Sequence, residues 1–150
     1  MREQVMYKSA VLVMLLSAAV LFNGCALFSW LKGKSGEPLV NTRWVVRTVH
    51  GNDVSSTGNE TWFVIKNENN QLNMSGRSEC NQFFVAVVAD DEKFSSGDPA
   101  RTKALCDNIK IEDMFLIALT EASKYEIDGK ILKFFNKDGK ELLKCEAVFL

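Results

Sequence analysis

The chain of 150 residues predicts a mainly β domain over residues 41–150, in which a barrel-like antiparallel sheet packs with one α-helix. Three observations lead to this fold class. Short runs of β-branched and aromatic residues recur between turn signals, two Asp-Gly turns separate apolar runs near the C-terminus, and one segment alone has apolar residues at helical spacing. Six to eight strands and one helix close most naturally into a small barrel or a strongly curved sheet.

The first half of this domain contains four strand signals. Arg43–Val49 is rich in β-branched residues and precedes a His-Gly-Asn-Asp turn, and Thr61–Lys66 is a second run of the same kind. Gln71–Ser75 alternates apolar and polar residues, as a half-buried strand does. Phe83–Ala89 is an unbroken apolar run, from which we expect a strand buried on both faces.

The last 26 residues predict an antiparallel meander. Asp128-Gly129 lies between Tyr125–Ile127 and Ile131–Phe135, and Asp138-Gly139 precedes Glu141–Phe149. Asp-Gly between apolar runs is a strong hairpin signal. In the last strand, one face is expected to carry Leu143, Cys145, Ala147 and Phe149.

The one predicted helix follows Asp107 or Asn108, either of which would serve as its N-cap. Its apolar stripe, which we expect to face the core, consists of Ile111, Met114, Phe115, Ala118, Leu119 and Ala122. Charged residues lie between these positions: Glu112, Asp113, Glu121 and Lys124.

The N-terminus has the form of a secretory signal peptide. Arg2 and Lys8 are followed by the apolar stretch Ala10–Phe22, which is too short to span a bilayer comfortably. A cysteine, Cys25, comes directly after a glycine and resembles a bacterial lipobox, in which the cysteine is acylated and becomes the new N-terminus. We therefore expect a lipoprotein signal peptide at 1–24 and lipidation at Cys25. Ordinary secretion, and an uncleaved anchor with a bystander thiol, are the alternatives.

Residues 25–40 are predicted to form a lipid-anchored tether. Its second half is polar and turn-rich, whereas its first half contains Leu27, Phe28, Trp30 and Leu31. These apolar residues would either enter the headgroup region, where Trp is favoured, or pack against the domain.

The charge balance indicates which partners to expect. The chain has 18 basic and 19 acidic residues, and without Arg2, Glu3 and Lys8 it keeps 16 and 18, a net charge of −2. A nucleic-acid-binding protein would show a basic patch or balance, so we expect no nucleic acid partner. The expected contact with the membrane is through the lipid alone.

Three cysteines remain once Cys25 is lipidated, which permits one disulfide and one free thiol in an oxidising compartment. Cys145 lies on an apolar strand face, where a buried inert thiol is expected. The chain has no CxxC pair and a single histidine, His50, so we expect no metal site.

The residues also predict that the chain is not an enzyme and takes no cofactor. A nucleophilic cysteine, Cys80 or Cys106, would have to be activated by His50, which lies in a predicted exposed turn. Carboxylates for acid–base chemistry would come from a segment that is more simply a solvated loop and that contains Asp90, Asp91, Glu92 and Asp98. A phosphate-binding loop, a GxSxG elbow and an HExxH motif are all absent from the sequence.

Two segments, Gly76–Phe83 (GRSECNQF) and Ala100–Cys106 (ARTKALC), resemble the signature segments of the META domain family, which includes heat-shock lipoproteins of the HslJ type. Glu112–Phe115 (EDMF) and the opening Asn41–Trp44 (NTRW) also fit that family. The resemblance covers about residues 41–149, and one departure is Glu79, which stands where a small residue is commoner. The motif residues carried over are Gly76, Cys80, Asn81, Phe83, Thr102, Cys106, Glu112 and Phe115.

The resemblance implies a mostly β, barrel-like fold and an envelope protein linked to stress tolerance, with no established catalytic activity. Its paired signature cysteines imply that Cys80 and Cys106 lie close together and form the disulfide. We further expect Asn81 and Thr102 to hydrogen-bond to the backbone across the junction of the two segments, because buried polar groups are rarely left unpaired.

The sequence thus predicts a lipoprotein of the outer membrane that faces the periplasm, since Ala26 follows the cysteine where an Asp would suggest inner-membrane retention. Its expected role is binding or structural support in envelope stress tolerance. The alternative is a pilot-like or chaperone-like binder that takes an apolar peptide or a lipid into a barrel cavity. That cavity would be lined by large apolar residues such as Phe83, Phe84, Phe134 and Phe135.

Overall fold

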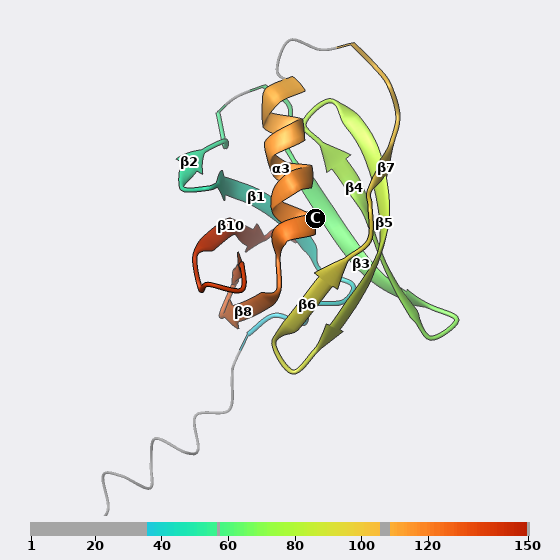
Figure 1. Cartoon of the computed structure of the whole chain (residues 1–150), viewed down its shortest axis with the longest axis vertical. Coiled ribbons are helices and arrows are strands. Elements are labelled where there is room, and N and C mark those ends of the chain that lie inside the picture. The colour runs from blue at the N-terminus through green and yellow to red at the C-terminus, as the bar shows by residue number, and fades with distance from the viewer. Residues whose placement is uncertain (1–35, 57, 106–108, 150) are drawn as a thin grey trace, which may run out of the picture. The chain divides into compact units, whose positions relative to one another are not determined.

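A computed structural model describes residues 36–56, 58–105 and 109–149 (Figure 1). In this part of the chain eight antiparallel strands form a closed barrel, and one helix, α3 (Ile109–Glu121), packs with it. In neighbour order the barrel strands are β1 (Arg43–Val49), β3 (Trp62–Glu68), β4 (Gln71–Ser78), β5 (Asn81–Asp90), β6 (Lys93–Ser96), β8 (Lys124–Asp128), β9 (Ile131–Phe135) and β10 (Glu141–Ala147). Two short strands lie beside the ring: β2 (Asn52–Asp53) pairs with β1, and β7 (Ala100–Arg101) pairs with β5.

The predicted fold class is confirmed, and pairing of the first strand with the last closes the barrel. Trp44 lies opposite Ala147 and Val46 opposite Cys145, so β1 and β10 leave no open edge between them. The predicted hairpin at Asp128-Gly129 is also present. Asp128 pairs with Ile131, and Gly129 has a φ of +57°, a conformation that glycine adopts without steric cost.

Aromatic side chains fill the interior of the barrel. The ring of Phe134 packs against those of Phe94 and Phe63, with centroids 4.7 Å and 6.2 Å apart. The helix adds Phe115, Leu116, Ala118 and Leu119 to this core. Because α3 contacts β1, β4, β6 and β10, it packs against strands from well-separated parts of the ring.

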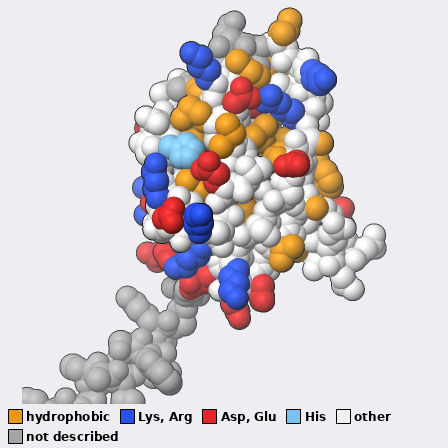
Figure 2. All heavy atoms as spheres, in the orientation of Figure 1, with side chains coloured by type: hydrophobic (Ala, Val, Ile, Leu, Met, Phe, Trp, Pro, Cys, Tyr) orange, Lys and Arg blue, Asp and Glu red, His pale blue; other side chains and the backbone are white. Residues whose placement is uncertain are grey.

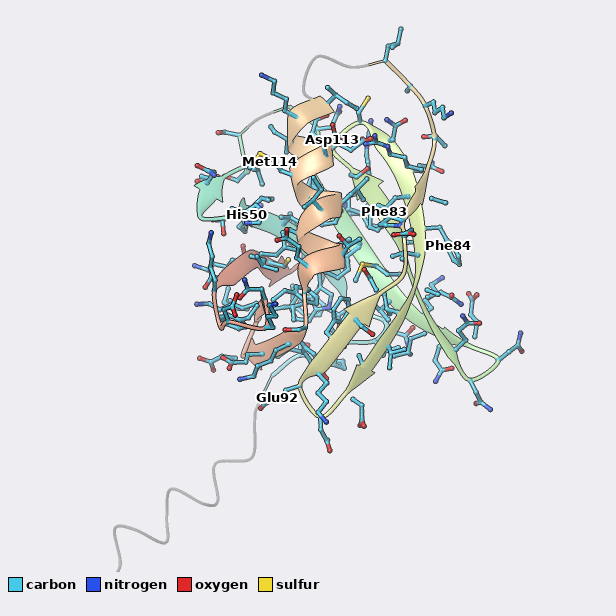
Figure 3. All side chains as sticks on the ribbon, in the orientation of Figure 1. His50, Phe83, Phe84, Glu92, Asp113 and Met114 are labelled. Carbon is cyan, nitrogen blue, oxygen red and sulfur yellow. The ribbon has the colours of Figure 1, made fainter. Side chains whose placement is uncertain are left out.

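Strand β5 differs from its prediction. Its side chains alternate, with Phe83, Val85 and Val87 buried, whereas Phe84 is 51% and Val88 66% exposed. Figure 3 shows Phe83 and Phe84 on opposite sides of the strand. The prediction that this run is buried on both faces is therefore wrong, because within the described part of the chain the outer face of β5 is open to solvent at Phe84 and Val88.

The segment after β5 also differs from the predicted loop. Lys93–Ser96 forms β6, which pairs with the end of β5. The two strands are joined at Asp91 and Glu92, which have φ values of 43° and 77°. The composition of this segment did not predict a strand, because its residues are mostly polar and Phe94 is the one buried in the core.

The end of the chain corrects another expectation. Leu143, Cys145 and Ala147 are all buried, and the burial expected for Cys145 is confirmed, but β10 ends at Ala147 and Phe149 is 59% exposed. A register shift between Glu141 and Leu143 also places Leu142 in the core. A β-bulge of this kind shifts which side chains face inward.

The domain begins earlier than the predicted boundary, and its compact unit starts at Gly36. Glu37 N donates to Gly129 O at 2.9 Å, and Trp44 Nε1 donates to Leu39 O at 3.1 Å. Residues 36–40, predicted to be the end of the tether, therefore belong to the domain. The predicted signal peptide at 1–24, the lipidation site Cys25 and the remainder of the tether lie outside the described residues.

No helix in the described ranges has the length and apolar character that a membrane span requires. On the face seen in Figure 2, basic and acidic side chains are interspersed, and hydrophobic side chains gather over α3 and along the β5 side.

Candidate functional site

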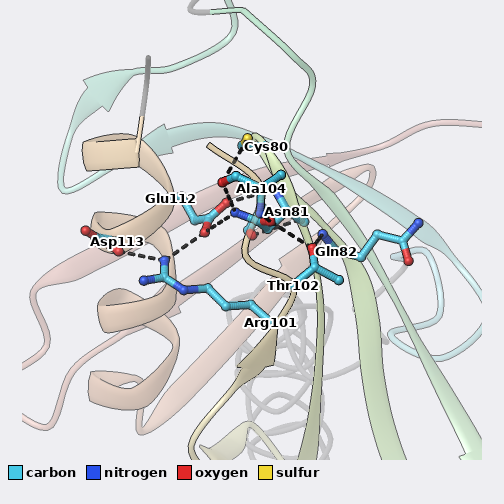
Figure 4. Close-up of polar contacts among 9 residues, drawn as sticks. Cys80, Asn81, Gln82, Arg101, Thr102, Ala104, Glu112 and Asp113 are labelled. Carbon is cyan, nitrogen blue, oxygen red and sulfur yellow. Dashed lines mark hydrogen bonds and ion pairs between the residues drawn. The ribbon is translucent and has the colours of Figure 1, made fainter. Parts of the chain in front are cut away.

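The motif residues converge where three segments meet: the β4–β5 turn, the stretch that follows β7, and the first turn of α3 (Figure 4). We call this cluster the motif junction and define it as Asn81, Arg101, Thr102, Ala104 and Glu112. These residues come from distant parts of the sequence, and hydrogen bonds join them directly.

The side chain of Asn81 connects the two signature segments. Its Oδ1 accepts hydrogen bonds from Ala104 N at 2.7 Å and from Thr102 Oγ1 at 2.8 Å. Thr102 Oγ1 in turn accepts a hydrogen bond from Gln82 N at 3.2 Å, and Thr102 N donates to Gln82 O at 3.0 Å. The hydrogen bonds to the backbone that we expected from Asn81 and Thr102 across the junction are therefore confirmed.

Glu112 is the buried acceptor of the motif junction. Its side chain has no exposed surface, and its carboxylate accepts hydrogen bonds from Asn81 N at 2.9 Å and from Asn81 Nδ2 at 3.0 Å. Arg101 Nη1 adds an ion pair at 2.7 Å. A buried charge is tolerated only with such compensation, so these contacts account for a carboxylate inside the fold.

Arg101 also binds a second carboxylate. Its Nη1 lies 2.6 Å from Asp113 Oδ1, and the hydrogen bond to Asp113 and the charge of Glu112 raise the pKa of the guanidinium. Arg101 was not among the predicted site residues. The carboxylates that it binds are 11 and 12 residues later in the chain, so local sequence spacing carried no signal for the pairing.

The turn that presents Asn81 is fixed by local hydrogen bonds. Ser78 Oγ donates to Asn81 O at 3.0 Å, and Cys80 N donates to Ser78 O at 2.9 Å. Glu79 is buried, with a φ of 68°, and its carboxylate accepts a hydrogen bond from Asn59 N at 3.2 Å. The glutamate that replaces a small residue here thus holds the segment before β3 against the turn.

Two apolar motif residues and one glycine complete the local packing. The rings of Phe83 and Phe115 meet edge to face, 5.3 Å apart. Gly76 lies where β3 comes so close that an added Cβ would be 2.0 Å from Trp62 O. The motif glycine therefore permits the approach of the two strands, and the phenylalanines pack strand β5 against the helix.

The cysteines are only partly placed. Cys80 Sγ lies 4.0 Å from Ala104 O, at the edge of the motif junction. Cys106, its predicted partner, lies outside the described residues, so the pairing stays a prediction. Cys145 is a free, buried thiol, and burial raises its pKa well above the ordinary value, which keeps it protonated.

The other residues considered for chemistry lie elsewhere. His50 is in the turn after β1, where its backbone N–H donates to the backbone oxygen of Leu142 at 2.7 Å. Asp91 and Glu92 form the β5–β6 turn, and Lys124 Nζ lies 3.6 Å from Glu92 Oε2. Among the described residues, no group of three His, Cys, Asp or Glu side chains could hold a metal ion.

These contacts show what the motif junction can do. Its carboxylate is sealed from solvent and its polar atoms are directed at one another, so it joins the helix, the β4–β5 turn and the segment after β7 into one unit. The motif junction therefore has a structural role, because its polar groups form hydrogen bonds and ion pairs with one another.

Comparison with known proteins places this fold in a family. Residues 37–149 match the META domain. An NMR structure of a protein from Burkholderia xenovorans is 21% identical, with a TM-score of 0.60, over 75% of this chain and 85% of that one. A second NMR structure of a protein is 19% identical, with a TM-score of 0.55, over 70% and 87% of the two chains. No curated protein matches the chain. Because the family match covers most of the chain, this protein belongs to the META domain family.

Proposed function

We propose that the chain is a lipid-anchored envelope protein whose META domain is a rigid, non-enzymatic binding or structural module in envelope stress tolerance. The anchor would be acylated Cys25, and the location would be the periplasmic face of the outer membrane. The lipobox-like sequence before Cys25 supports the anchor. Because the domain begins at Gly36, about ten residues would form the tether between the acylated cysteine and the domain.

One observation carries the rigid-module proposal: large buried side chains pack against one another inside the barrel. Phe134 packs against both Phe63 and Phe94 in the core, and each of the three is at most 3% exposed. Interiors packed in this way transmit force and resist deformation. The motif junction then fastens the helix to the barrel wall.

The alternative, a pilot-like binder of an apolar peptide or lipid, requires a cavity inside the barrel. Phe83 and Phe134 belong to the core, while Phe84 turns outward to solvent. A ligand in the lumen would have to displace two core rings, which costs several kcal/mol if the cost resembles that of removing buried aromatic side chains. Binding in the barrel is therefore the less favoured proposal.

The proposal includes a disulfide between Cys80 and Cys106. Cys80 Sγ lies beside Ala104, two residues before Cys106, and Cys145 is a free thiol buried in the core. A disulfide that closes the loop from Cys80 to Cys106 would stabilise the fold by about 3 kcal/mol on the chain-entropy model.

The anchor and the bridge are tested together by the intact mass of the unreduced protein, extracted from its own membranes and alkylated during unfolding. The expected mass is that of residues 25–150 plus acyl chains, with one alkylated thiol and two hydrogens missing. An unacylated chain would overturn the anchor, and three alkylated thiols would overturn the disulfide. Peptide mapping then shows whether Cys80 is joined to Cys106.

The physiological role is tested by deleting the gene and restoring either the natural chain or a Cys25→Ser variant. We expect survival under heat or envelope stress to fall on deletion, to return with the natural chain, and to return only in part with Cys25→Ser. Equal survival of the deletion strain would contradict a stress role. An Asp91→Ala variant serves as a control, because this turn residue has no proposed function.

A further inference from the structure

An outward-facing row of three side chains crosses neighbouring strands of the barrel. Trp62 on β3 lies opposite Arg77 on β4, which lies opposite Gln82 on β5. Residues paired in this way have Cβ atoms about 5 Å apart, so the three side chains start from neighbouring points on the outer face of the sheet. A groove of about 760 Å³ runs along this row, and Ser75 on β4 also lines it.

Arg77 is the arginine of the described residues that has no carboxylate partner. Arg43 pairs with Glu60, Arg47 with Glu146, and Arg101 with Glu112 and Asp113. The guanidinium of Arg77 is held only by its Nε, which donates to Glu79 O at 3.1 Å. This bond orients the guanidinium and leaves its terminal nitrogens available to bind a ligand. A planar guanidinium can bind a carboxylate in bidentate geometry.

Trp62 is held in place by Arg43 on the neighbouring strand β1. The guanidinium of Arg43 lies 4.2 Å from the centre of the indole ring, and Arg43 Nη2 is itself fixed by Glu60 at 2.6 Å. Arg43 lies over one side of the indole, and Trp62 is also a lining residue of the groove. An indole fixed in this way offers a flat apolar surface with little loss of side-chain entropy on binding.

The remaining polar groups of the groove complete a mixed surface. The side chain of Gln82 extends away from the motif junction (Figure 4), and Ser75 lies two pairs beyond Arg77 along β4. Among the described residues that line the groove there is one arginine and no carboxylate, so these side chains together carry a positive charge. Its volume is within the range of small-molecule sites.

We propose that this groove binds an acidic sugar, a pyranose ring that carries a carboxylate. The apolar C–H face of the ring would stack on Trp62, the carboxylate would pair with Arg77, and the ring hydroxyl or amide groups would bind Gln82 and Ser75. Neither an apolar peptide nor a neutral sugar uses both the flat indole and the unpaired guanidinium. This inference does not depend on the lipid anchor, because every residue in it belongs to the barrel.

The test is a titration of the ¹⁵N-labelled full chain, held in a polyoxyethylene detergent that contains no sugar. The probes are N-acetylmuramic acid, N-acetylglucosamine, which lacks the lactyl carboxylate, and lactate, which lacks the ring. We expect saturable shifts of the Trp62 indole N–H and of the Arg77 and Gln82 amides with N-acetylmuramic acid. The affinity for N-acetylglucosamine should be about tenfold lower, and lactate should leave the indole unshifted.

Variants separate the two contacts. Arg77→Gln should lower the affinity for N-acetylmuramic acid about tenfold and leave that for N-acetylglucosamine unchanged. Arg47→Gln, which removes an arginine on β1 that does not line the groove, should change neither affinity. The amide spectrum of each variant, compared with that of the natural chain, shows that the barrel is folded.

Four results would overturn the proposal. They are the absence of saturable shifts, equal affinity of the Arg77→Gln and natural chains for N-acetylmuramic acid, binding of lactate as tight as that of the sugar, and displacement of the sugar by a tetraglutamate peptide that binds more tightly. The last result would assign the groove to an acidic peptide.

Discussion

Glu112, at the start of α3, accepts two hydrogen bonds from one residue, Asn81: one from its backbone N–H and one from its side-chain amide. The two residues are 31 positions apart, and both are buried. Because the carboxylate is sealed from water, Asn81 and Arg101 replace its hydration. The pair therefore fixes the position of the helix relative to the β4–β5 turn. A single substitution at either residue is expected to lower the stability of the fold.

We expect Asn81→Ala to lower the free energy of unfolding by about 2–4 kcal/mol, because it removes the side-chain partners of Glu112, Thr102 and Ala104 from a buried site. The measurement is denaturant unfolding of the full chain. Asn73→Ala is the matched control, since Asn73 is an asparagine on β4 for which the structure shows no side-chain hydrogen bond. It should change the free energy by no more than about 0.5 kcal/mol. Equal effects of the two substitutions would contradict the role of Asn81.

The two carboxylates bound by Arg101 should differ greatly in their contribution to stability. Glu112→Ala is expected to cost about 3–5 kcal/mol, because it leaves Arg101 and the amide of Asn81 without their buried acceptor. Asp113→Ala removes an ion pair to the same arginine, but the Asp113 side chain is 48% exposed, so we expect a loss below about 1 kcal/mol. Chemical unfolding of both variants under one buffer condition provides the comparison, and similar losses would show that burial is not decisive.

Much of the barrel follows from the sequence because its strands are specified locally. Arg43–Val49 was predicted at its observed bounds, and the Asp-Gly hairpin fixed β8 and β9 by turn chemistry. The prediction failed where tertiary context decides. The apolar run of β5 could not show that Phe84 would face solvent, and the polar segment of β6 forms a strand because β5 offers it an edge.

The site was predictable only in part. Asn81 and Thr102 could be named from the signature segments, and their hydrogen bonds are present as expected. Glu112 was named as a motif residue from the resemblance, but the helical pattern put it among charged residues between the apolar positions, where solvent exposure is the ordinary outcome. Its burial depends on Arg101, which approaches from β7, and no periodicity within one element encodes a contact between two elements.

Strand spacing provides a test of Gly76. An alanine Cβ at this position would lie 2.0 Å from Trp62 O and 2.7 Å from Phe63 Cα, both backbone atoms that move only if β3 and β4 separate. We expect Gly76→Ala to cost about 3 kcal/mol or more, at the upper end of overpacking penalties. At Gly97 the nearest atom to an added Cβ is 3.7 Å away, so Gly97→Ala should be neutral or slightly stabilising. Thermal unfolding of the two variants tests this contrast, and a stable Gly76→Ala protein would refute the close approach.

The buried thiol of Cys145 predicts a dependence of stability on alkaline pH. Burial raises the pKa of this thiol in the folded chain, whereas in the unfolded chain a cysteine titrates at about 8.5. A raised folded pKa stabilises the fold fully below the unfolded value. That contribution is lost as the pH rises above 8.5, because the unfolded state alone releases the proton. Between pH 7.5 and 9.5 we expect a loss of about 1 kcal/mol from this group.

A Cys145→Ala variant isolates the effect of the thiol. It should start from a lower free energy of unfolding because of the smaller side chain, and then lose less stability over the same pH interval. Tyr125, whose pKa is also raised by burial and by the charges of Asp91 and Asp90, is common to both proteins and cancels in the comparison. The measurement is urea unfolding at several pH values, with unreduced masses recorded to detect thiol–disulfide exchange. If the curves of the two proteins run parallel, the thiol is not protected by folding, and the buried position of Cys145 is wrong.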